Sequence, residues 1–549
     1  MTRHWKLRSI ALAAAAFATV GTLAACGGSG GSGGSSASGP SGVLTVTTGS
    51  AGTYLDNFNM FSPNVEVPAN GMIYEPLFFY DTAKSTVIKP WLGSSYAWSN
   101  GGRTVTVQLK HNVKWTDGKP FTSADVVYTF QLAIQNTAIN KFGLPLASVS
   151  ADGTYGVKIN FTKPAYSFAY YALGRVEILP KHVWSGDSFK TITTSLNEHP
   201  VGTGAYELSS FSAQSMTFTA NPHYYMPGMP HFKTIRFVSY NSNTSSDAAI
   251  ENGTIDWAGS YIPDIKKLYL SKGPKNVVTD IPLSTAFLVP NLHSGPTANL
   301  AVRKAISAAI NRTYISNTVY NGYATATNPE ALILPNYKAQ LSPALAGASF
   351  PAPSASKAKS ILASAGIKTP VNITVDMVSG YTDYLSDLEI IQSELKPAGI
   401  NLTIAQPAYA SFITDQSTGK FQMLMDNFGY TPDPYDYYYS ILDSSIGPPI
   451  GQADSVGNYN RFKNATVDAA LATIAGTNDA ATQNQAFAQI EKIFAQQLPE
   501  IPLFNQQDEI EFNGNIVSNY PSVSDPYAAP AVYIQPDIGW VAMNLKPAK

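Results

Sequence analysis

Alternating apolar and polar positions predict strands in the first third of the chain. The alternation is clearest over 43–48, 103–109 and 155–161, and side chains two residues apart share one face of a strand. Between the last two segments, apolar residues near helical spacing predict a helix over 122–136. Its expected start places Thr122 three residues before Asp125, a pair typical of a capping box. The first third is therefore mixed α and β.

The later part of the chain shows a more regular order of elements. We predict one helix over 300–312, a short helix over 357–365 that Gly366 ends, a strand over 371–378, a helix over 385–396 and a strand over 400–405. Strand, helix and strand in that order indicate a βαβ unit and a sheet covered by helices. Two further helices, around 465–474 and 484–497, precede Pro499 and Pro502, which favour an extended segment.

The N-terminus has the pattern of a secretory signal. Arg3, Lys6 and Arg8 precede an Ala-rich apolar stretch over 9–25, which is short for a permanent membrane span. The stretch ends beside Cys26, the only cysteine of the chain, in a pattern that resembles a bacterial lipobox. Acyl chains on Cys26 would anchor the protein to the outer face of the cell membrane. Residues 27–42 are a Gly/Ser-rich tether, and we expect the rest to be extracytoplasmic.

Charge and composition narrow the function classes. The chain has 549 residues, which predicts two to four domains. Its 35 Lys and Arg against 37 Asp and Glu give a net charge of −2, which argues against a nucleic-acid partner because that binding needs a basic excess. The 31 tyrosines supply side chains that are apolar on one face and polar at the edge.

Catalytic and metal signals are weak. The seven histidines never pair at i and i+4, there is no HExxH motif, and we expect no metal and no cofactor. Ser354 and Lys357 fit an SxxK motif without its partner motifs, so a helix cap is the simpler interpretation of Ser354. Paired carboxylates for glycoside hydrolysis are a three-dimensional property, and a secreted hydrolase therefore stays as a lower alternative.

Several short motifs, taken in order, resemble one known family. They are 74–77 (YEPL), 89–92 (KPWL), 113–130 (VKWTDGKPFTSADVVYTF), 178–182 (ILPKH), 200–206 (PVGTGAY), 221–225 (NPHYY), 253–256 (GTID), 302–305 (VRKA) with 311–312 (NR), 433–434 (DP) and 501–503 (IPL). The chain is similar to the extracellular solute-binding proteins of ABC transporters, family 5, the peptide, dipeptide and nickel class. Most of these motifs suit a scaffold: the Asp-Gly pair after Trp115 suits a tight turn, and Gly202 and Gly204 allow close backbone approach.

The resemblance implies an α/β, two-lobed fold like that of periplasmic binding proteins (type II, cluster C-like), with an extra small α+β domain inserted in the first lobe. Mapped onto this chain, lobe one comprises 43–85, 200–285 and 500–549, the inserted domain 86–199, and lobe two 286–499. A solute would bind between the hinged lobes, and the closed form would deliver it to the membrane permease. We expect a monomer that performs no covalent chemistry.

One departure from the family pattern concerns the solute. In peptide-binding members, a stretch resembling W-x-x-D-x-x-[DE]-P supplies an Asp that pairs with the peptide's α-ammonium. Here Asn427 stands at the Trp position and Tyr430 at the Asp position. Asp426 and Asp433 lie nearby and are candidate substitutes, and Phe428 lies between. The family favours an oligopeptide, whereas Tyr430 and the tyrosines of 435–439 also suit an oligosaccharide of the cello or xylo type.

Candidate solute contacts from the other lobe come from three places. Asn57, Phe58 and Asn59 follow the first strand, Trp257 follows the GTID motif, and Phe504 lies where the chain returns to lobe one. Each of these residue types suits core packing at least as well as contact with a solute.

Overall fold

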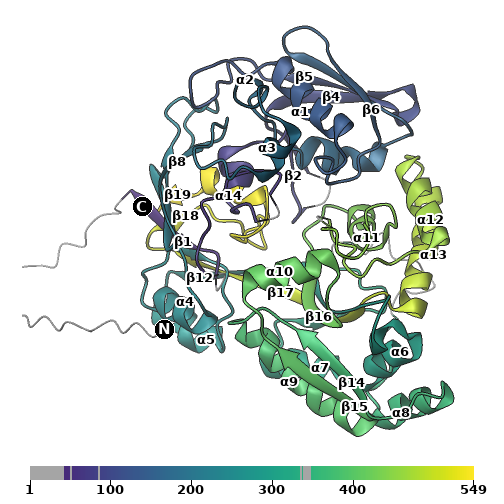
Figure 1. Ribbon diagram of the computed structural model, residues 1–549. Helices are drawn as coiled ribbons and strands as arrows, with labels where there is room; N and C mark the ends of the chain where they lie inside the picture. Colours follow the sequence, from purple (N-terminus) through teal and green to yellow (C-terminus); the bar gives the residue numbers. More distant parts are fainter. Residues whose placement is uncertain are drawn as a thin grey trace, which may run out of the picture. The chain divides into compact units, whose positions relative to one another are not determined.

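Of the two units of the computed structural model (Figure 1), the second comprises residues 42–549 and is compact. The structure describes residues 42–49, 52–62, 64–84, 87–333, 337, 348–454 and 456–549. The predicted signal segment, Cys26 and most of the predicted tether lie outside the described residues. Within those residues, no helix combines the length and the apolar character that a membrane crossing requires.

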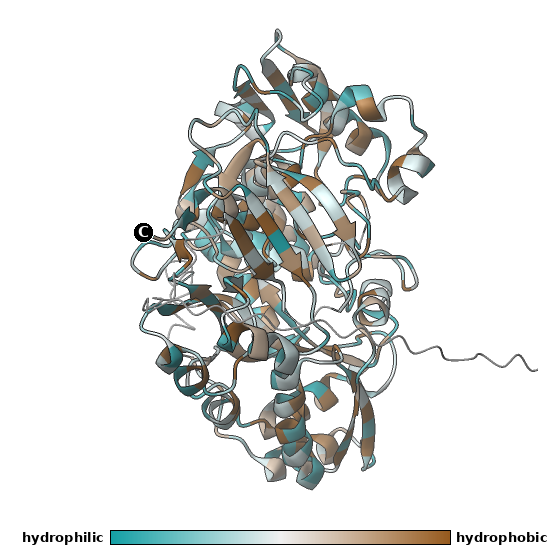
Figure 2. Ribbon diagram, turned by 90° about the vertical axis from the view of Figure 1, so that its left-hand side faces the viewer, coloured by the Kyte–Doolittle hydropathy of each residue, from teal (hydrophilic) through white to brown (hydrophobic). Residues whose placement is uncertain are grey.

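One large sheet runs through the second unit. Its order is β15-β14-β16-β12-β17-β11-β1-β10-β9-β8. One group of strands at its first end comprises β14 (Val371–Asp376), β15 (Ile400–Ala405) and β16 (Met423–Gly429). The group at the other end comprises β1 (Val43–Thr47), β8 (Tyr206–Ser212), β9 (Ser215–Ala220), β10 (Thr234–Val238) and β11 (Trp257–Ala258). Figure 2 shows hydrophobic, brown positions alternating with paler ones along the strands.

Two long strands join these groups and are called the crossing pair. β12 (Asn276–Pro290) and β17 (Ile501–Asn513) are antiparallel and pair from Asn276–Asn513 to Leu288–Ile501. The register shifts between Pro282 and Ser284. Within the part of the chain that the structure describes, β12 pairs with β17 alone before that shift, whereas from Ser284 onward it also pairs with β16. The crossing pair is therefore the structural link between the two groups of strands.

The predicted βαβ unit is confirmed. β14 and β15 are parallel and in register from Val371–Ile400 to Asp376–Ala405, and α9 (Thr382–Leu395) connects them. The predicted strand boundaries agree within two residues. Helix α8 (Ala355–Ser364) begins at the Ser354 cap, whose hydroxyl accepts the N–H of Lys357 at 3.1 Å. Gly366 has φ 68°, as a helix-ending glycine requires.

A separate four-stranded sheet lies within the predicted inserted domain. Its order is β4-β5-β7-β6, with β4 (Gly93–Ser99), β5 (Thr104–Leu109), β6 (Leu146–Ala151) and β7 (Gly156–Phe161). Helix α1 (Ser123–Gln135) packs on it, as Figure 1 shows. The capping box is confirmed: the N–H of Thr122 donates to Asp125 at 2.9 Å.

The single helix predicted over 300–312 is two helices. α6 (Leu300–Ala309) ends before Ile310, whose backbone is extended. The side chain of Asn311 then accepts the N–H of Tyr314 at 3.1 Å and starts α7 (Arg312–Val319). An asparagine that caps a new helix outweighs the continuous apolar pattern, because capping satisfies a backbone donor that would otherwise lack a partner.

Short strands and further helices complete the described chain. The strands are β2 (Phe78–Tyr80), β3 (Ile88–Pro90), β13 (Thr325–Ala326), β18 (Val517–Ser518) and β19 (Lys546–Pro547). The helices are α2 (Lys181–Trp184), α3 (Phe189–Thr194), α4 (Asn243–Glu251), α5 (Ile265–Leu268), α10 (Tyr409–Thr418), α11 (Pro434–Leu442), α12 (Ala465–Ala475), α13 (Ala480–Gln497) and α14 (Asp537–Asn544). The helices predicted at 465–474 and 484–497 are α12 and α13.

One buried carboxylate joins four of the sequence motifs. Glu75, from YEPL, has no exposed surface and accepts four hydrogen bonds. The donors are Trp91 Nε1 at 2.7 Å (KPWL), Thr203 Oγ1 at 2.9 Å (PVGTGAY), and Tyr224 Oη at 2.7 Å and Tyr225 Oη at 3.1 Å (NPHYY). A buried carboxylate needs such donors because desolvation is costly. These motifs therefore maintain the fold.

The close backbone approach expected at the motif glycines is also present. A Cβ on Gly202 would lie 2.0 Å from the carbonyl oxygen of Ile73, and one on Gly204 would lie 2.1 Å from that of Met72. The Asp-Gly turn closes with the N–H of Gly118 donating to Trp115 O at 2.8 Å, and Gly118 has φ 85°. The Trp115 side chain has no exposed surface and anchors this turn in the core.

We predict that Gly204→Ala destabilises the protein by about 3 kcal/mol, because backbone cannot move aside as a flexible side chain can. Thermal unfolding measures this loss. Gly186→Ala is the matched control, since a Cβ there meets nothing within 4 Å, and its unfolding temperature should equal that of the unaltered chain. Equal unfolding temperatures for both variants would contradict the close packing at Gly204.

Candidate functional site

Strand β16 becomes accessible at its C-terminal end. Met423, Leu424 and Met425 are buried, whereas the residues from Asp426 to Gly429 are half-buried. The β14–β16 ladder contains only two residue pairs, the last of which is Asp376 with Leu424. Beyond it, the recorded ladder of β16 is with β12 alone. The segment 426–430, singled out from the sequence, therefore lies on an open edge beside the crossing pair.

Asn427 connects three elements at this edge. Its side-chain amide donates to Tyr384 Oη at 2.8 Å and to Gln506 Oε1 at 3.2 Å. Tyr384 belongs to α9 and also donates to Gln506 at 3.2 Å, and Gln506 belongs to β17. Asn427 is thus held by the crossing pair and by α9, and its position depends on both.

Asp426 is a half-buried carboxyl group without a basic partner among the described ion pairs. Burial raises its pKa to about 7, although hydrogen bonds from the N–H of Asn427 and the amide of Gln416 oppose the shift. Asp426 therefore carries only part of a negative charge near neutral pH.

Tyr430 is held by three segments of the chain. Its N–H donates to Leu283 O of β12 at 2.8 Å, and its carbonyl accepts Tyr170 Oη at 3.4 Å. Its ring meets Tyr533 edge to face, with centroids 6.2 Å apart. The backbone has φ 58°, a conformation that costs a non-glycine residue about 1 kcal/mol or more. The surrounding structure fixes this half-buried tyrosine in place.

The neighbouring residues of the motif have structural roles. Asp433 caps α11, accepting the N–H of Asp436 at 3.1 Å. Phe428 is half-buried, and its ring lies near those of Phe287 and Tyr459 at 5.9 and 5.7 Å. The tyrosines of α11 are buried in the hydrophobic core; they are Tyr435, Tyr437, Tyr438 and Tyr439. Their rings therefore pack in this core.

The asparagines after the first strand stabilise their own loop. Asn57 donates to Ser62 Oγ at 2.7 Å and accepts the N–H of Asn59 at 3.2 Å. Asn59 donates to the carbonyls of Ile192 and Ser195 at 2.8 and 2.6 Å. Both side chains are buried and committed to protein partners, which explains why polar residues occur in this segment.

Phe58, Trp257 and Phe504 have no exposed surface. Phe58 packs edge to face on Phe211 and Phe218, and Trp257 Nε1 donates to Pro530 O at 2.9 Å. Phe504 belongs to the core beneath β14–β16. The structure therefore favours packing over solute contact for all three, because each apolar ring fills a core.

The structure adds side chains that sequence reasoning missed. Tyr384 and Gln506 hold Asn427, yet both lie in segments interpreted only as helix and extended chain. Tyr409 at the start of α10 is 44% exposed, and Asp426 and Glu66 lie close enough to raise its pKa beyond the effect of burial. No local pattern marks these residues, since Tyr384 and Gln506 lie 43 and 79 residues from Asn427 along the chain and meet it only in the fold.

A group of carboxyls lies on one face of the crossing pair and is called the hinge carboxyl cluster. Asp280 of β12 is directly opposite Glu509 of β17, and Glu511 is two residues further on the same face. Asp247 of α4 and Asp383 of α9 complete it. Among the described ion pairs, none gives these carboxyls a basic partner. Like charges directly opposite each other destabilise paired strands.

Burial raises the pKa of every member of this cluster. The pKa of Glu509 rises to about 8, with the charges of Asp280 and Asp383 adding to burial. That of Asp247 rises to about 7, and those of Asp280 and Asp383 to about 6. The pKa of Glu511 lies well above its usual range. The cluster therefore holds protons near neutral pH.

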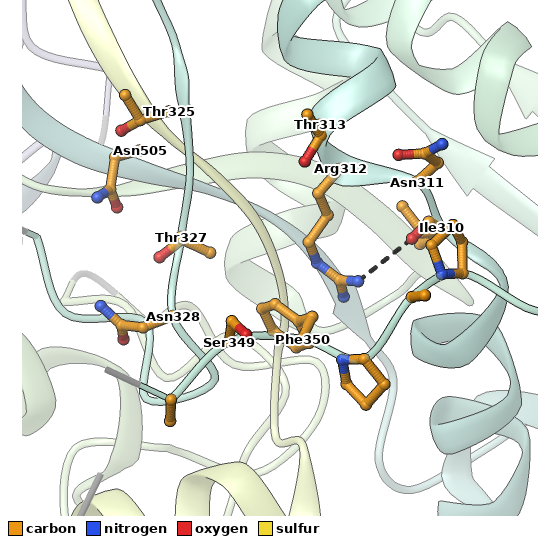
Figure 3. Close-up of a pocket in the computed structure, with 14 residues that line it drawn as sticks. Ile310, Asn311, Arg312, Thr313, Thr325, Thr327, Asn328, Ser349, Phe350 and Asn505 are labelled. Carbon is orange, nitrogen blue, oxygen red and sulfur yellow. Dashed lines mark hydrogen bonds between the residues drawn. The ribbon is translucent and has the colours of Figure 1, made fainter. Parts of the chain in front are cut away.

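A pocket of about 360 Å³ opens at the start of α7 (Figure 3). Arg312 lies over the ring of Phe350 at 3.5 Å, and its guanidinium donates to backbone carbonyls, including Pro502 O at 2.7 Å and Ile310 O at 3.5 Å. Threonines and asparagines line the pocket together with small apolar residues and prolines. The site residues predicted from the sequence lie elsewhere, and the bonds of Arg312 give it a structural role.

Among the residues that the structure describes, no group of three or more His, Cys, Asp or Glu side chains has the arrangement to hold a metal ion. The hinge carboxyl cluster is included in that result.

Solved structures share the arrangement of the described chain. A mannohexaose-bound periplasmic oligopeptide-binding protein of an oligopeptide ABC transporter from Thermotoga maritima aligns with a TM-score of 0.85 at 24% identity, over 92% of this chain and 98% of that one. The oligopeptide-binding protein AppA from Bacillus subtilis, in complex with a nonapeptide, aligns with a TM-score of 0.79 at 21% identity, over 93% and 100%. The chain thus has the two-lobed type II fold of periplasmic binding proteins.

Sequence relatives agree with this fold class. The family model of the bacterial extracellular solute-binding proteins, family 5 Middle, matches residues 87–448, and the chain belongs to this family. A nickel-binding periplasmic protein from Escherichia coli K12 is 26% identical over 451 residues, which cover 78% of this chain and 82% of the relative. The resemblance stated from the motifs is confirmed.

The hinge carboxyl cluster predicts a pH-dependent stability. A carboxyl whose pKa is raised on folding binds its proton more tightly in the folded state, so stability falls as pH rises from its usual pKa near 4 to the raised value near 8. We expect thermal unfolding temperatures to fall between pH 5 and pH 8.5. The free energy of unfolding should decrease over the same pH range, and Glu509→Gln should reduce that decrease by on the order of 1–2 kcal/mol.

Glu389→Gln, an exposed glutamate of α9, is the control and should leave the pH dependence unchanged. Parallel pH curves for the unaltered chain and Glu509→Gln would show that Glu509 holds no proton at neutral pH.

Proposed function

We propose that this protein is the substrate-binding subunit of an ABC importer, which captures oligopeptides between two hinged lobes and delivers them to a membrane permease. The family supports the solute-binding role, and AppA, with its nonapeptide, has a similar fold. The observation that carries the proposal is the crossing pair, because it links two groups of strands beside the accessible end of β16.

We assign lobe one to 43–85, 200–285 and 500–549, the inserted domain to 86–199, and lobe two to 286–499. The register shift between Pro282 and Ser284 supports a hinge near 285. Solute would drive closure by binding the closed form more tightly, and a change from 1:99 to 99:1 closed requires about 5.5 kcal/mol of differential binding.

An oligosaccharide is the second candidate solute. Tyr430 replaces the aspartate that pairs with a peptide ammonium in the family pattern, and it is half-buried beside Tyr533. Aromatic rings bind the C–H faces of sugars while their hydroxyls hydrogen-bond. The Thermotoga relative in the structural comparison holds mannohexaose.

The same proposal includes location and chemistry. Acylation at Cys26 would anchor the protein to the outer face of the cell membrane, with the Gly/Ser-rich segment as a tether. We expect the protein to act as a monomer and to leave its solute unchanged. A secreted hydrolase remains the competing class.

A direct binding assay separates these classes. We predict that tri- to pentapeptides raise the unfolding temperature and are recovered intact by mass spectrometry. Mannohexaose and xylohexaose are tested in the same two measurements. Stabilisation by the sugars alone would transfer the proposal to oligosaccharides, and hydrolysis of either set would overturn the binding-protein role.

Tyr430 is the solute contact proposed from lobe two. Tyr430→Ala should weaken binding of the stabilising solute at least about tenfold, because the loss of a buried aromatic contact costs about 1.5 kcal/mol or more. Titration calorimetry measures the affinity. Tyr314→Ala, on the exposed face of α7 at 52% exposure, is the control, and equal affinities for the two variants would remove Tyr430 from the site.

A further inference from the structure

Asp436 has a fully buried carboxyl group whose two oxygens can still accept hydrogen bonds. It lies in the first turn of α11 and has no exposed surface. Neither of its carboxyl oxygens accepts a hydrogen bond from a described group. Its backbone is satisfied, since its N–H donates to Asp433 and its carbonyl accepts Tyr171 Oη at 3.0 Å. Buried carboxyl groups in folded proteins almost always have a partner.

Aromatic residues from three proposed domains surround this carboxyl group. Burial raises the pKa of each of the nearby tyrosines, and the charge of Asp436 raises it further; they include Tyr80, Tyr170, Tyr171, Tyr435 and Tyr439. Tyr80 and Tyr170 precede or belong to the inserted domain, whereas Asp436 belongs to lobe two. Phe168 meets Tyr435 and Tyr439 edge to face across the same boundary. The carboxyl group is thus enclosed where the parts meet.

Among the described residues, Arg175 is the cation that lowers the pKa of Asp436, but it bonds to a tyrosine instead, and its Nε has no described hydrogen-bond partner. Arg175 donates to Tyr170 Oη at 3.0 Å and lies over the rings of Phe142 and Tyr170 at 5.7 and 5.8 Å. It does not form an ion pair with Asp436 among those of the described residues. Asp433 on α11 adds negative charge at Asp436, and Asp537 of α14 adds it at Tyr170. The surroundings therefore have a deficit of positive charge.

We propose that Asp436 and its surrounding tyrosines form the subsite that receives a cationic group of the solute, such as a primary ammonium. A carboxylate supplies the charge partner, and aromatic faces attract cations through their quadrupoles. This inference rests on the proposed oligopeptide function. It places the ammonium partner six residues beyond Tyr430, in the first turn of α11 and two residues after the end of the family pattern.

Proton release follows from the same geometry. Without solute, burial and the charge of Asp433 raise the pKa of Asp436 well above its usual range, and Arg175 only partly opposes this. A bound ammonium favours the ionised form and displaces the proton. A free-amine peptide should therefore release protons on binding, and affinity should increase with pH.

The experiment compares peptides with and without the ammonium. Tri- to pentapeptides and their N-acetylated counterparts are titrated into the full chain, and the bound forms are measured by native mass spectrometry. We expect the unaltered chain to prefer the free-amine peptides. Asp436→Asn should reduce that preference at least about tenfold, with N-acetylated peptides bound as before.

Glu330→Gln is the matched control, because Glu330 is also fully buried with two unpartnered carboxyl oxygens yet is flanked by lobe-two residues such as Tyr438 and Glu491. It should keep the preference. An unchanged preference in Asp436→Asn would overturn the subsite and leave the peptide function intact. If the unaltered chain retains no peptide, both proposals fail.

Calorimetry of the unaltered chain in two buffers of different ionisation enthalpy tests the subsite without a variant. Proton release by free-amine peptides, and none by N-acetylated ones, supports the subsite. Equal proton release by both sets would overturn it, even if Asp436→Asn fails to fold.

Discussion

The pairing of β12 with β17 is the constraint on which the structure depends. Its ladder runs from Asn276–Asn513 to Leu288–Ile501 and is the only strand pairing, within the described residues, that reaches both groups of strands. Two residues of the candidate site are hydrogen-bonded to these strands. Tyr430 bonds to Leu283 of β12, and Asn427 bonds to Gln506 of β17. A change in the angle between the strand groups must therefore move these side chains, which couples hinge and site.

Local patterns were sufficient for most elements because their causes are local. The capping box at Thr122, the helix end at Gly366 and the βαβ unit over 371–405 follow from spacing and residue type alone. The helix predicted over 300–312 was wrong, because apolar periodicity continues through a break that the Asn311 side chain creates. The sequence predicted a scaffold role for the family motifs. It did not predict that four of them meet at Glu75, because that contact forms only in the fold.

The candidate site was partly predictable. The segment 426–430 stood out through its departure from a family pattern, and it lies at the accessible end of β16. Phe58, Trp257 and Phe504 are buried instead, because residue type does not tell a core aromatic from a binding aromatic. Asp436 lies within a run of tyrosines and has no sequence pattern of its own. What distinguishes it is that its two carboxyl oxygens have no hydrogen-bond partner among the described groups, and this depends on the three-dimensional structure. Family similarity explains the fold, whereas the solute depends on these individual side chains.

Small-angle X-ray scattering of the protein, stripped of solute and then saturated with a stabilising peptide or sugar, tests hinged capture most directly. The account predicts a smaller radius of gyration in the saturated protein, because the lobes close on the solute. An unchanged radius of gyration, with saturation verified by native mass spectrometry of the same sample, would contradict it.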